Sequence, residues 1–262
     1  MEEEKKIDED ELVETSPFLK ISDVRNNTRA KNLRLKENDI IVAIDGEEFH
    51  GNRSELLKTL TNNKGQWLIT IFRENVFFEI IVRGTLGVSV KKTTSEETIL
   101  VKEGLEKHQI YDIAEYRIFE VLRNIHRDVD ILETTPSLMS WFFPPFWLVQ
   151  NRLWEALMVS LCLYFISISV AWWMFLITWC LLAMYFRKGQ TTLIRSFSIY
   201  REKHFWLILA AINEEDVQKV CRSFDQKCNF DYSMVGKPIT EETNDDETPK
   251  KNSSEESLNP AT

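Results

Sequence analysis

Histidines and cysteines are the residues of this chain that could bind a metal or form a nucleophile and base pair. The histidines are scattered, at His50, His108, His126 and His204. The cysteines are Cys162, Cys180, Cys221 and Cys228, and none forms a CxxC pair. Zinc sites and disulfide frameworks need closely spaced ligands or paired cysteines. We therefore predict no metal and no cofactor.

Catalytic motifs are also missing from the sequence. It contains no G-x-S-x-G, phosphate-binding loop, GxGxxG or HExxH, the motifs that place a nucleophile, a phosphate or a zinc ion. Asp39 lies next to a turn and is interpreted as a turn former. The acidic pairs Glu47-Glu48 and Glu214-Glu215 are interpreted as solvated or helix-capping charges. The chain is predicted not to be an enzyme.

Charge is unevenly distributed along the 262 residues. The formal net charge is −9, which argues against nucleic-acid binding because phosphate contacts need a basic surface. Charged residues are concentrated in the first 137 and last 75 positions. The acidic ends, 1–16 and 231–262, are predicted to be a disordered leader and a disordered tail. The leader has no apolar signal-peptide core, so export is not expected.

The elements predicted between residues 17 and 90 alternate between strands and one helix. Strands are expected at 18–24 and 39–44, and a hairpin at 66–72 and 76–82. A helix over 53–61 is expected to begin at Asn52, with Glu55 as its capping-box partner. This order predicts a small α+β domain.

This domain resembles a bacterial PDZ domain. The resemblance is carried by residues 28–46, where Ala30, Leu35, Asp39, Ile41, Ile44 and Gly46 match the family pattern. Two usual glycines are replaced, by Arg34 and Asn38. The segment Arg83-Gly-Thr-Leu-Gly-Val88 resembles the R-G-x-L-G-V segment of periplasmic protease PDZ domains.

The PDZ resemblance implies a site for a peptide C-terminus. A permuted strand order would place Leu86, Gly87 and Val88 beside the helix at 53–61, with Ser54 and Leu57 facing the peptide. Backbone N–H groups would then hold the carboxylate, and the strand edge would pair with the peptide. A degenerate PDZ fold without an open groove is the alternative.

Residues 91–137 are predicted to be a linker that contains one amphipathic helix over 111–127. Its apolar residues recur at three-residue spacing: Ile113, Tyr116, Phe119, Leu122 and Ile125. Such a face packs against a neighbouring domain or lies on a membrane surface.

Residues 138–188 are predicted to be a membrane region. The segment 138–150 contains Pro144-Pro145 and many aromatics, which favours an interfacial position. The 31 residues from 156 to 186 carry no charge, and one helix of this length would measure about 46 Å, beyond a ~30 Å hydrocarbon core. A tilted helix or a hairpin could explain this. Positive charge at both ends favours a hairpin of helices at about 153–169 and 171–187.

The rest of the chain, 189–230, is predicted to form a small helix–strand–helix unit. A buried strand is expected at 205–212, and Asn213 is expected to cap a helix at 214–225. Residues 115–226 resemble a two-span bacterial inner-membrane family known as a domain of unknown function. The segments that carry this resemblance are 142–148, 151–156 and 209–217. The family implies no reaction.

Together these predictions describe an α+β PDZ-like domain, an α-helical membrane hairpin and a small αβα cytoplasmic unit. The expected function is a membrane-anchored scaffold or adaptor that recruits a protein partner to the bacterial inner membrane. The alternative is an accessory or regulatory subunit of a membrane protease or transporter complex. Expected partners are a peptide C-terminus and the lipid bilayer, and both termini are expected to be cytoplasmic.

Overall fold

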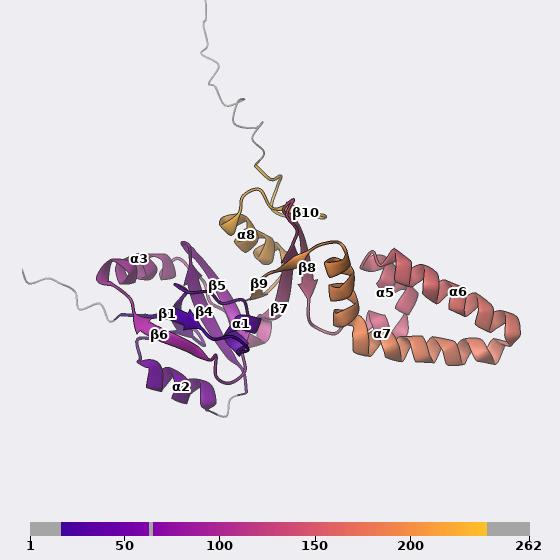
Figure 1. Cartoon of the computed structure of the whole chain (residues 1–262), viewed down its shortest axis with the longest axis horizontal. Helices are drawn as coiled ribbons and strands as arrows, with labels where there is room; N and C mark the ends of the chain where they lie inside the picture. Colours follow the sequence, from indigo (N-terminus) through magenta and orange to yellow (C-terminus); the bar gives the residue numbers. More distant parts are fainter. Residues whose placement is uncertain (1–16, 63–64, 240–262) are drawn as a thin grey trace, which may run out of the picture.

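A computed structural model describes residues 17–62 and 65–239 of the protein (Figure 1). The predicted leader 1–16 and residues 240–262 of the predicted tail lie outside the described residues. The strands are β1 (Leu19–Val24), β2 (Ile40–Ile44), β3 (Glu47–Glu48), β4 (Trp67–Arg73), β5 (Val76–Val82), β6 (Val88–Lys92), β7 (Arg117–Arg123), β8 (Asp128–Glu133), β9 (His204–Ala211) and β10 (Asn229–Phe230). The helices are α1 (Arg29–Asn32), α2 (Arg53–Thr61), α3 (Ser95–Leu105), α4 (Met139–Phe142), α5 (Pro144–Gln150), α6 (Trp154–Val170), α7 (Trp172–Tyr200) and α8 (Glu214–Phe224), with a 3-10 turn at Ile113–Glu115.

The described strands form one continuous sheet. Its order is β10-β8-β7-β9-β5-β4-β2-β1-β6, with β3 beside β2. All pairs are antiparallel except β10 with β8. The N-terminal and C-terminal strands meet between β5 and β9, where Glu79 is opposite Ala210. One apolar core extends across this junction, from Leu19 in β1 to Phe230 in β10.

The elements predicted for the N-terminal half are confirmed within one or two residues at each end. α2 begins after Asn52, whose side-chain oxygen accepts the backbone N–H groups of Ser54 and Glu55 at 2.9 and 3.1 Å. The Glu55 carboxylate accepts the N–H of Asn52 at 3.0 Å, which completes the predicted capping box. β4 and β5 form the predicted hairpin.

The turn before β2 is held by a buried ion pair. Asp39 accepts two hydrogen bonds from the Arg73 guanidinium, both at 2.6 Å. Arg73 also donates to the carbonyl of Arg34 at 3.0 Å. Arg34 and Asn38 have φ of 58° and 72°, the left-handed region that glycine usually occupies. The Arg73 bond holds the backbone at Arg34, and the Asn38 N–H donates to the carbonyl of Ile21 at 2.9 Å.

Two local predictions for residues 91–127 are wrong. The expected linker contains α3, whose first turn is closed by a capping box between Thr94 and Glu97. The expected amphipathic helix at 111–127 is the 3-10 turn followed by strand β7. β7 has β8 on one side and β9 on the other, so pairing with both neighbours outweighs a helical pattern.

The strand and helix predicted after residue 204 are confirmed as β9 and α8. The Asn213 side chain accepts the N–H of Asp216 at 3.0 Å and caps α8. β9, however, lies between β5 and β7 in the middle of the sheet. Residues 189–230 therefore supply a central strand of a shared sheet and form no separate αβα unit.

The predicted membrane hairpin needs correction. α6 and α7 do pack against each other, and the chain turns between them at Ala171, whose φ is −163°. Among the described residues, no helix is both long enough and apolar enough to cross a membrane. α6 has 17 residues, and the longer α7 carries Arg187, Lys188 and Arg195 in its second half. The expectations of transmembrane helices and of a multi-pass inner-membrane protein are therefore wrong.

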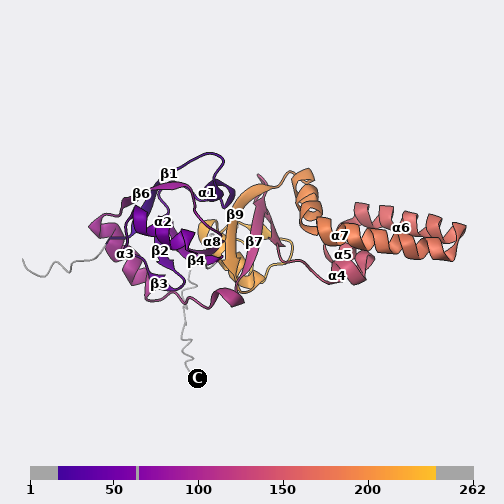
Figure 2. The same ribbon diagram turned by 90° about the horizontal axis from the view of Figure 1, so that it is seen from below.

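The helical part of the molecule projects away from the sheet. Figures 1 and 2 show α6 and the first part of α7 side by side, extending beyond β8, with α4 and α5 near their base. α7 bends in Figure 1 before it reaches the sheet. α4 and α5 are separated at Phe143, directly before the prolines, and Pro144 occupies the first turn of α5. The break that the prolines predict is confirmed.

Candidate functional site

β6 is an open strand edge. It is the last strand of the described sheet and pairs only with β1. Thr93, one residue beyond β6, donates its N–H to the carbonyl of Phe18 at 3.0 Å. Alternate residues of an antiparallel strand direct their backbone groups to the same neighbour. Lys91 and Ser89 therefore face β1, and Val88 and Val90 present their N–H and C=O groups on the open side.

The loop before β6 is shaped by two glycines. Gly84 and Gly87 have φ of 71° and 74°. A Cβ at Gly87 would lie 2.7 Å from Cγ2 of Thr28, so no larger residue fits there without a shift. The carbonyl of Leu86 accepts the N–H of Ala30 at 3.0 Å and fixes the loop to α1.

In this loop Gly87 is half-buried, whereas Leu86 is 1% exposed, so the N–H of Gly87 is the one that a ligand can reach. In the described part of the chain, neither Leu86 nor Gly87 donates its backbone N–H to another protein group. The Arg29 guanidinium lies beside the loop, since a Cβ at Gly84 would come within 2.7 Å of its Nη1. Free N–H groups beside a cation form an environment suited to a carboxylate.

Helix α2 contributes two residues to the apolar cluster that contains Leu86. Leu56 and Leu60 are buried in the same cluster as Leu86, and Val88 and Val90 pack against that cluster. The other two predicted site residues lie differently. Ser54 belongs to the α2 cap, with its hydroxyl donating to Asn52 at 2.6 Å. Leu57 is exposed on α2.

Four residues of this region were not predicted from the sequence. Leu56 and Leu60 could have been found by their i, i+4 spacing, which places them on one face of α2. Val90 follows Val88 by two positions and so shares its side of β6. Arg29 gives no local signal, because its position beside Gly84 depends on the tertiary fold.

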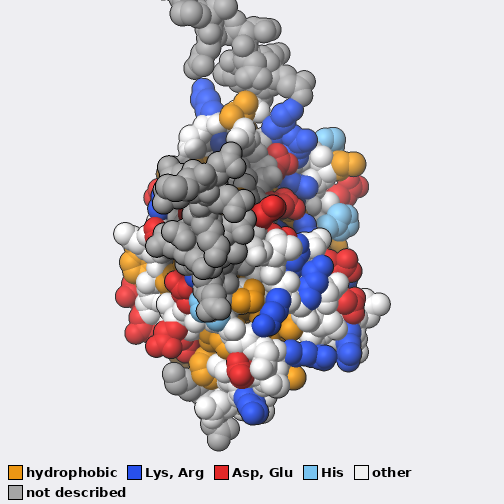
Figure 3. Space-filling view, turned by 90° about the vertical axis from the view of Figure 1, so that its left-hand side faces the viewer, with side chains coloured by type: hydrophobic (Ala, Val, Ile, Leu, Met, Phe, Trp, Pro, Cys, Tyr) orange, Lys and Arg blue, Asp and Glu red, His pale blue; other side chains and the backbone are white. Residues whose placement is uncertain are grey.

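The end of the molecule that carries these elements has mixed charge. Figure 3 shows acidic and basic side chains interspersed with scattered hydrophobic ones on this face. Such a surface does not offer the continuous basic stripe that nucleic-acid backbones require.

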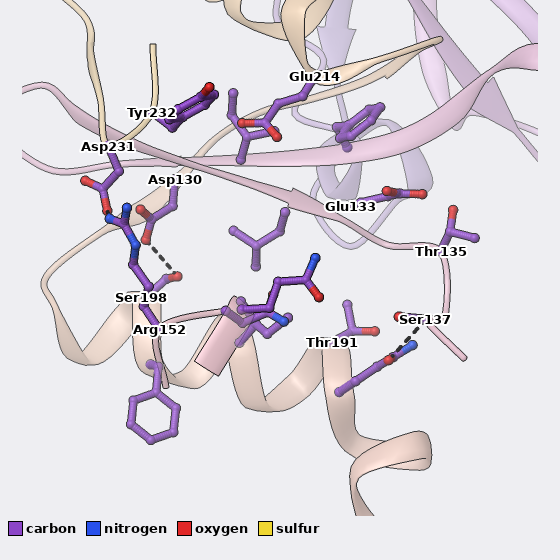
Figure 4. Close-up of a pocket in the computed structure, with 18 of the residues that line it drawn as sticks. Asp130, Glu133, Thr135, Ser137, Arg152, Thr191, Ser198, Glu214, Asp231 and Tyr232 are labelled. Carbon is purple, nitrogen blue, oxygen red and sulfur yellow. Dashed lines mark hydrogen bonds and ion pairs between the residues drawn. The ribbon is translucent and has the colours of Figure 1, made fainter. Parts of the chain in front are cut away.

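A hollow lies between the sheet and the helices, apart from the β6 edge. It has a volume of about 720 Å³ and is bounded by β7, β8, α5, α7 and the chain after α8. Figure 4 shows Arg152 beside Asp231 and Asp130 beside Ser198. Asp130 accepts from the Ser198 hydroxyl at 3.0 Å and from the Lys203 ammonium at 2.6 Å. Arg152 pairs with Asp231 at 2.7 Å.

The pairs in this hollow join the helical part to the sheet. Asp130 belongs to β8, whereas Ser198 belongs to α7. The Arg195 guanidinium of α7 similarly pairs with Glu120 of β7. These pairs hold α7 against the sheet.

Metal-binding groups are not assembled in the described residues. No cluster of three or more His, Cys, Asp or Glu side chains is found there. His108 contacts Glu79, and His50 contacts Glu48 at 3.0 Å. Cys162 and Cys180 are exposed, whereas Cys221 and Cys228 are buried.

Comparison with protein-family models and with curated proteins gives no match. The PDZ resemblance and the resemblance to a two-span family therefore stay predictions from the sequence.

Proposed function

We propose that the protein is a non-enzymatic adaptor that binds the C-terminus of a partner protein at β6. The peptide would add a strand to the open edge, with its backbone paired to Val88 and Val90. Its terminal carboxylate would accept the N–H of Gly87, with Arg29 nearby. The observation that carries the proposal is the open edge of β6 directly after a loop in which the Gly87 N–H has no partner among the described residues.

The side-chain preference follows from the walls of the site. Val88 and Val90 of β6 are half-buried and pack against the apolar cluster that contains Leu56 and Leu60 of α2. An apolar last residue would bury surface there, at roughly 25 cal/mol per Å². We therefore expect peptides that end in Val, Leu or Ile to bind best.

A proline substitution at the open edge tests the proposal. Val90→Pro removes an N–H that faces the peptide, and Ser89 before it is already extended, as proline requires. We expect the folded variant to lose binding to C-terminal peptides, measured by fluorescence polarisation with the full chain. The same peptides with an amidated C-terminus should not bind the unchanged protein.

Lys91→Pro is the matched comparison, because the Lys91 N–H faces β1. We expect it to lower the free energy of unfolding by about 1 kcal/mol or more, whereas Val90→Pro leaves that pairing intact. Equal peptide binding by Val90→Pro and the unchanged protein would overturn the proposal. A full C-terminal library without any binding peptide would do the same.

A further inference from the structure

The hairpin of α6 and the first half of α7 has an unusual surface. Its large apolar side chains point outward: Met158, Val159, Leu163, Phe165, Ile166, Ile168, Val170, Trp172, Trp173, Leu176, Ile177, Leu181 and Met184 are all exposed. Phe165 and Val170 each expose 71% of their surface. Isolated exposed apolar residues are common, but a continuous surface of them marks an interaction site.

Several polar residues of the hairpin lie between its helices, whereas Ser169 near the tip is exposed. Ser160 of α6 is 1% exposed. The hydroxyls of Ser167 in α6 and Thr178 in α7 are 2.7 Å apart and form a hydrogen bond between the helices. Tyr164 is buried against Phe175 of α7. Small and polar residues between helices, with apolar residues outside, are the arrangement found where lipid surrounds a helix pair.

The exposed apolar residues point in many directions. Successive residues of an α-helix are about 100° apart, so Phe165, Ile166 and Leu163 together cover about half of the α6 circumference. A helix that packs on one protein surface needs an apolar stripe of roughly 100°. One protein partner would leave much of this surface uncovered, whereas acyl chains can contact every side of a hairpin that enters one leaflet of a lipid surface.

The charges of the chain segment that contains the hairpin are almost all positive, although Arg152 and Arg195 pair with Asp231 and Glu120 elsewhere in the chain. Residues 134–201 contain five basic residues, Arg152, Arg187, Lys188, Arg195 and Arg201, and a single acidic one, Glu155. This contrasts with the net charge of −9 for the whole chain. Arg187 and Lys188 are exposed on α7 where the uncharged stretch ends. Basic residues in this position attract anionic headgroups.

Aromatic residues surround the same end of the hairpin. Trp141, Phe142, Phe143, Phe146 and Trp154 are exposed on α4, α5 and the start of α6. The Arg187 guanidinium lies over the Trp141 ring, 4.4 Å from its centre. Tryptophan beside basic residues is typical of the boundary between hydrocarbon and headgroups.

From these observations we propose that the hairpin docks on a lipid surface that carries negative charge. The apolar sides of α6 and α7 contact acyl chains, and the basic and aromatic residues at the base contact headgroups. The proposal concerns contact with one lipid surface and requires no crossing of it. It is independent of peptide binding at β6, which lies at the other end of the sheet.

Vesicle flotation with the full chain tests the proposal. We expect the protein to float with vesicles of equal parts phosphatidylcholine and phosphatidylglycerol, and less with phosphatidylcholine alone. The triple variant Phe165→Ser, Ile166→Ser, Val170→Ser should stay in the soluble fraction. Ile125→Ser is its control, because Ile125 is 88% exposed but lies on the turn between β7 and β8.

Two further measurements distinguish lipid contact from contact with a protein. Lys188→Gln should weaken binding to the mixed vesicles about fivefold, the effect of one basic residue near an anionic surface. Cys162 and Cys180, which are exposed on the hairpin, should react more slowly with a maleimide once vesicles are added.

Three outcomes would overturn the proposal. The first is that the protein does not float with the mixed vesicles. The second is that the triple variant and the unchanged protein float equally. Circular dichroism checks that both proteins are folded. The third is a dimer that the triple variant dissociates and that does not float. That result would assign the surface to a second copy of the chain.

Discussion

The buried cysteines of α8 and the segment after it have shifted acidity. Burial raises the pKa of the Cys221 thiol, and it raises that of Cys228 as well. Since the thiolate is the reactive form, both thiols should be inert in the folded protein. With a thiol reagent near neutral pH and no lipid, we expect Cys162 and Cys180 to react first.

The check is a time course by mass spectrometry, with and without denaturant. Cys162→Ser combined with Cys180→Ser should remove the fast phase, while the slow phase should appear only as the protein unfolds. Rapid modification of Cys221 in native protein would contradict the expected burial.

At the residue scale, contacts between near neighbours could be predicted and distant ones could not. The caps at Asn52 and Asn213 depend on residues three positions away, so the sequence alone predicts them. The ion pair joins Asp39, in the turn before β2, to Arg73 at the end of β4, and only the fold brings them together. The left-handed Arg34 is explained by that pair and could not have been expected from residue type.

At the scale of elements, the Asp128 carboxylate of β8 forms hydrogen bonds that connect β8 to β10. Asp128 accepts side-chain amide bonds from Asn124 at 2.9 Å and from Asn229 at 3.0 Å. The Asn124 bond and then the Asn229 bond lower the pKa of Asp128 below its ordinary value. The carboxylate is therefore more acidic in the folded protein than in the unfolded chain.

This shift gives Asp128 a stability contribution with a defined sign. A lowered pKa stabilises the fold above the unfolded-state pKa, and the contribution is lost as pH falls through the folded-state pKa. Asp128→Asn should flatten the acid side of the stability profile measured by urea titration. Asp23→Asn, at an exposed residue of β1, is the control, and an unchanged acid limb in Asp128→Asn would contradict the assignment.

The errors in element prediction have physical causes. In β7, Phe119 and Val121 point to one face and Glu120 to the other, yet all three are buried. Glu120 is buried because Arg195 of α7 pairs with it, so the strand lacks the alternation that would identify it. α3 could have been found, since Thr94 followed by Glu97 is a capping-box signal.

At the scale of the whole molecule, the apolar core is shared by both halves of the chain. Phe78 of β5 is 1% exposed, and its ring centre lies 5.9 Å from that of Phe224 in α8. Phe78→Ala should lower the free energy of unfolding by about 3–5 kcal/mol. Because one core spans the sheet, we expect a single transition by circular dichroism and by tryptophan fluorescence.

Leu57→Ala, on the exposed side of α2, should change stability little and serves as the control. Two separate transitions in the Phe78→Ala protein would show that the halves unfold independently.

The order of strands in the sheet could not be predicted. Sequence pattern identified β4, β5 and β9 as strands, but periodicity does not say which strands become neighbours. We expected β9 to belong to a separate unit after the hairpin. It instead pairs with β5 and β7, two strands that precede the hairpin in the sequence. The sequence of the hairpin resembles that of a membrane span because it is apolar. Apolar composition alone does not determine where each helix begins and ends.

The central place of β9 has a consequence for how the protein is made. The ribosome synthesises β5 and β7 well before residues 204–211. Each of these strands therefore has one unpaired edge while α6 and α7 are synthesised. Unpaired edges invite association with other chains. The nascent chain is therefore prone to aggregate until β9 pairs with β5 and β7. We expect chaperones to bind the chain most during this interval.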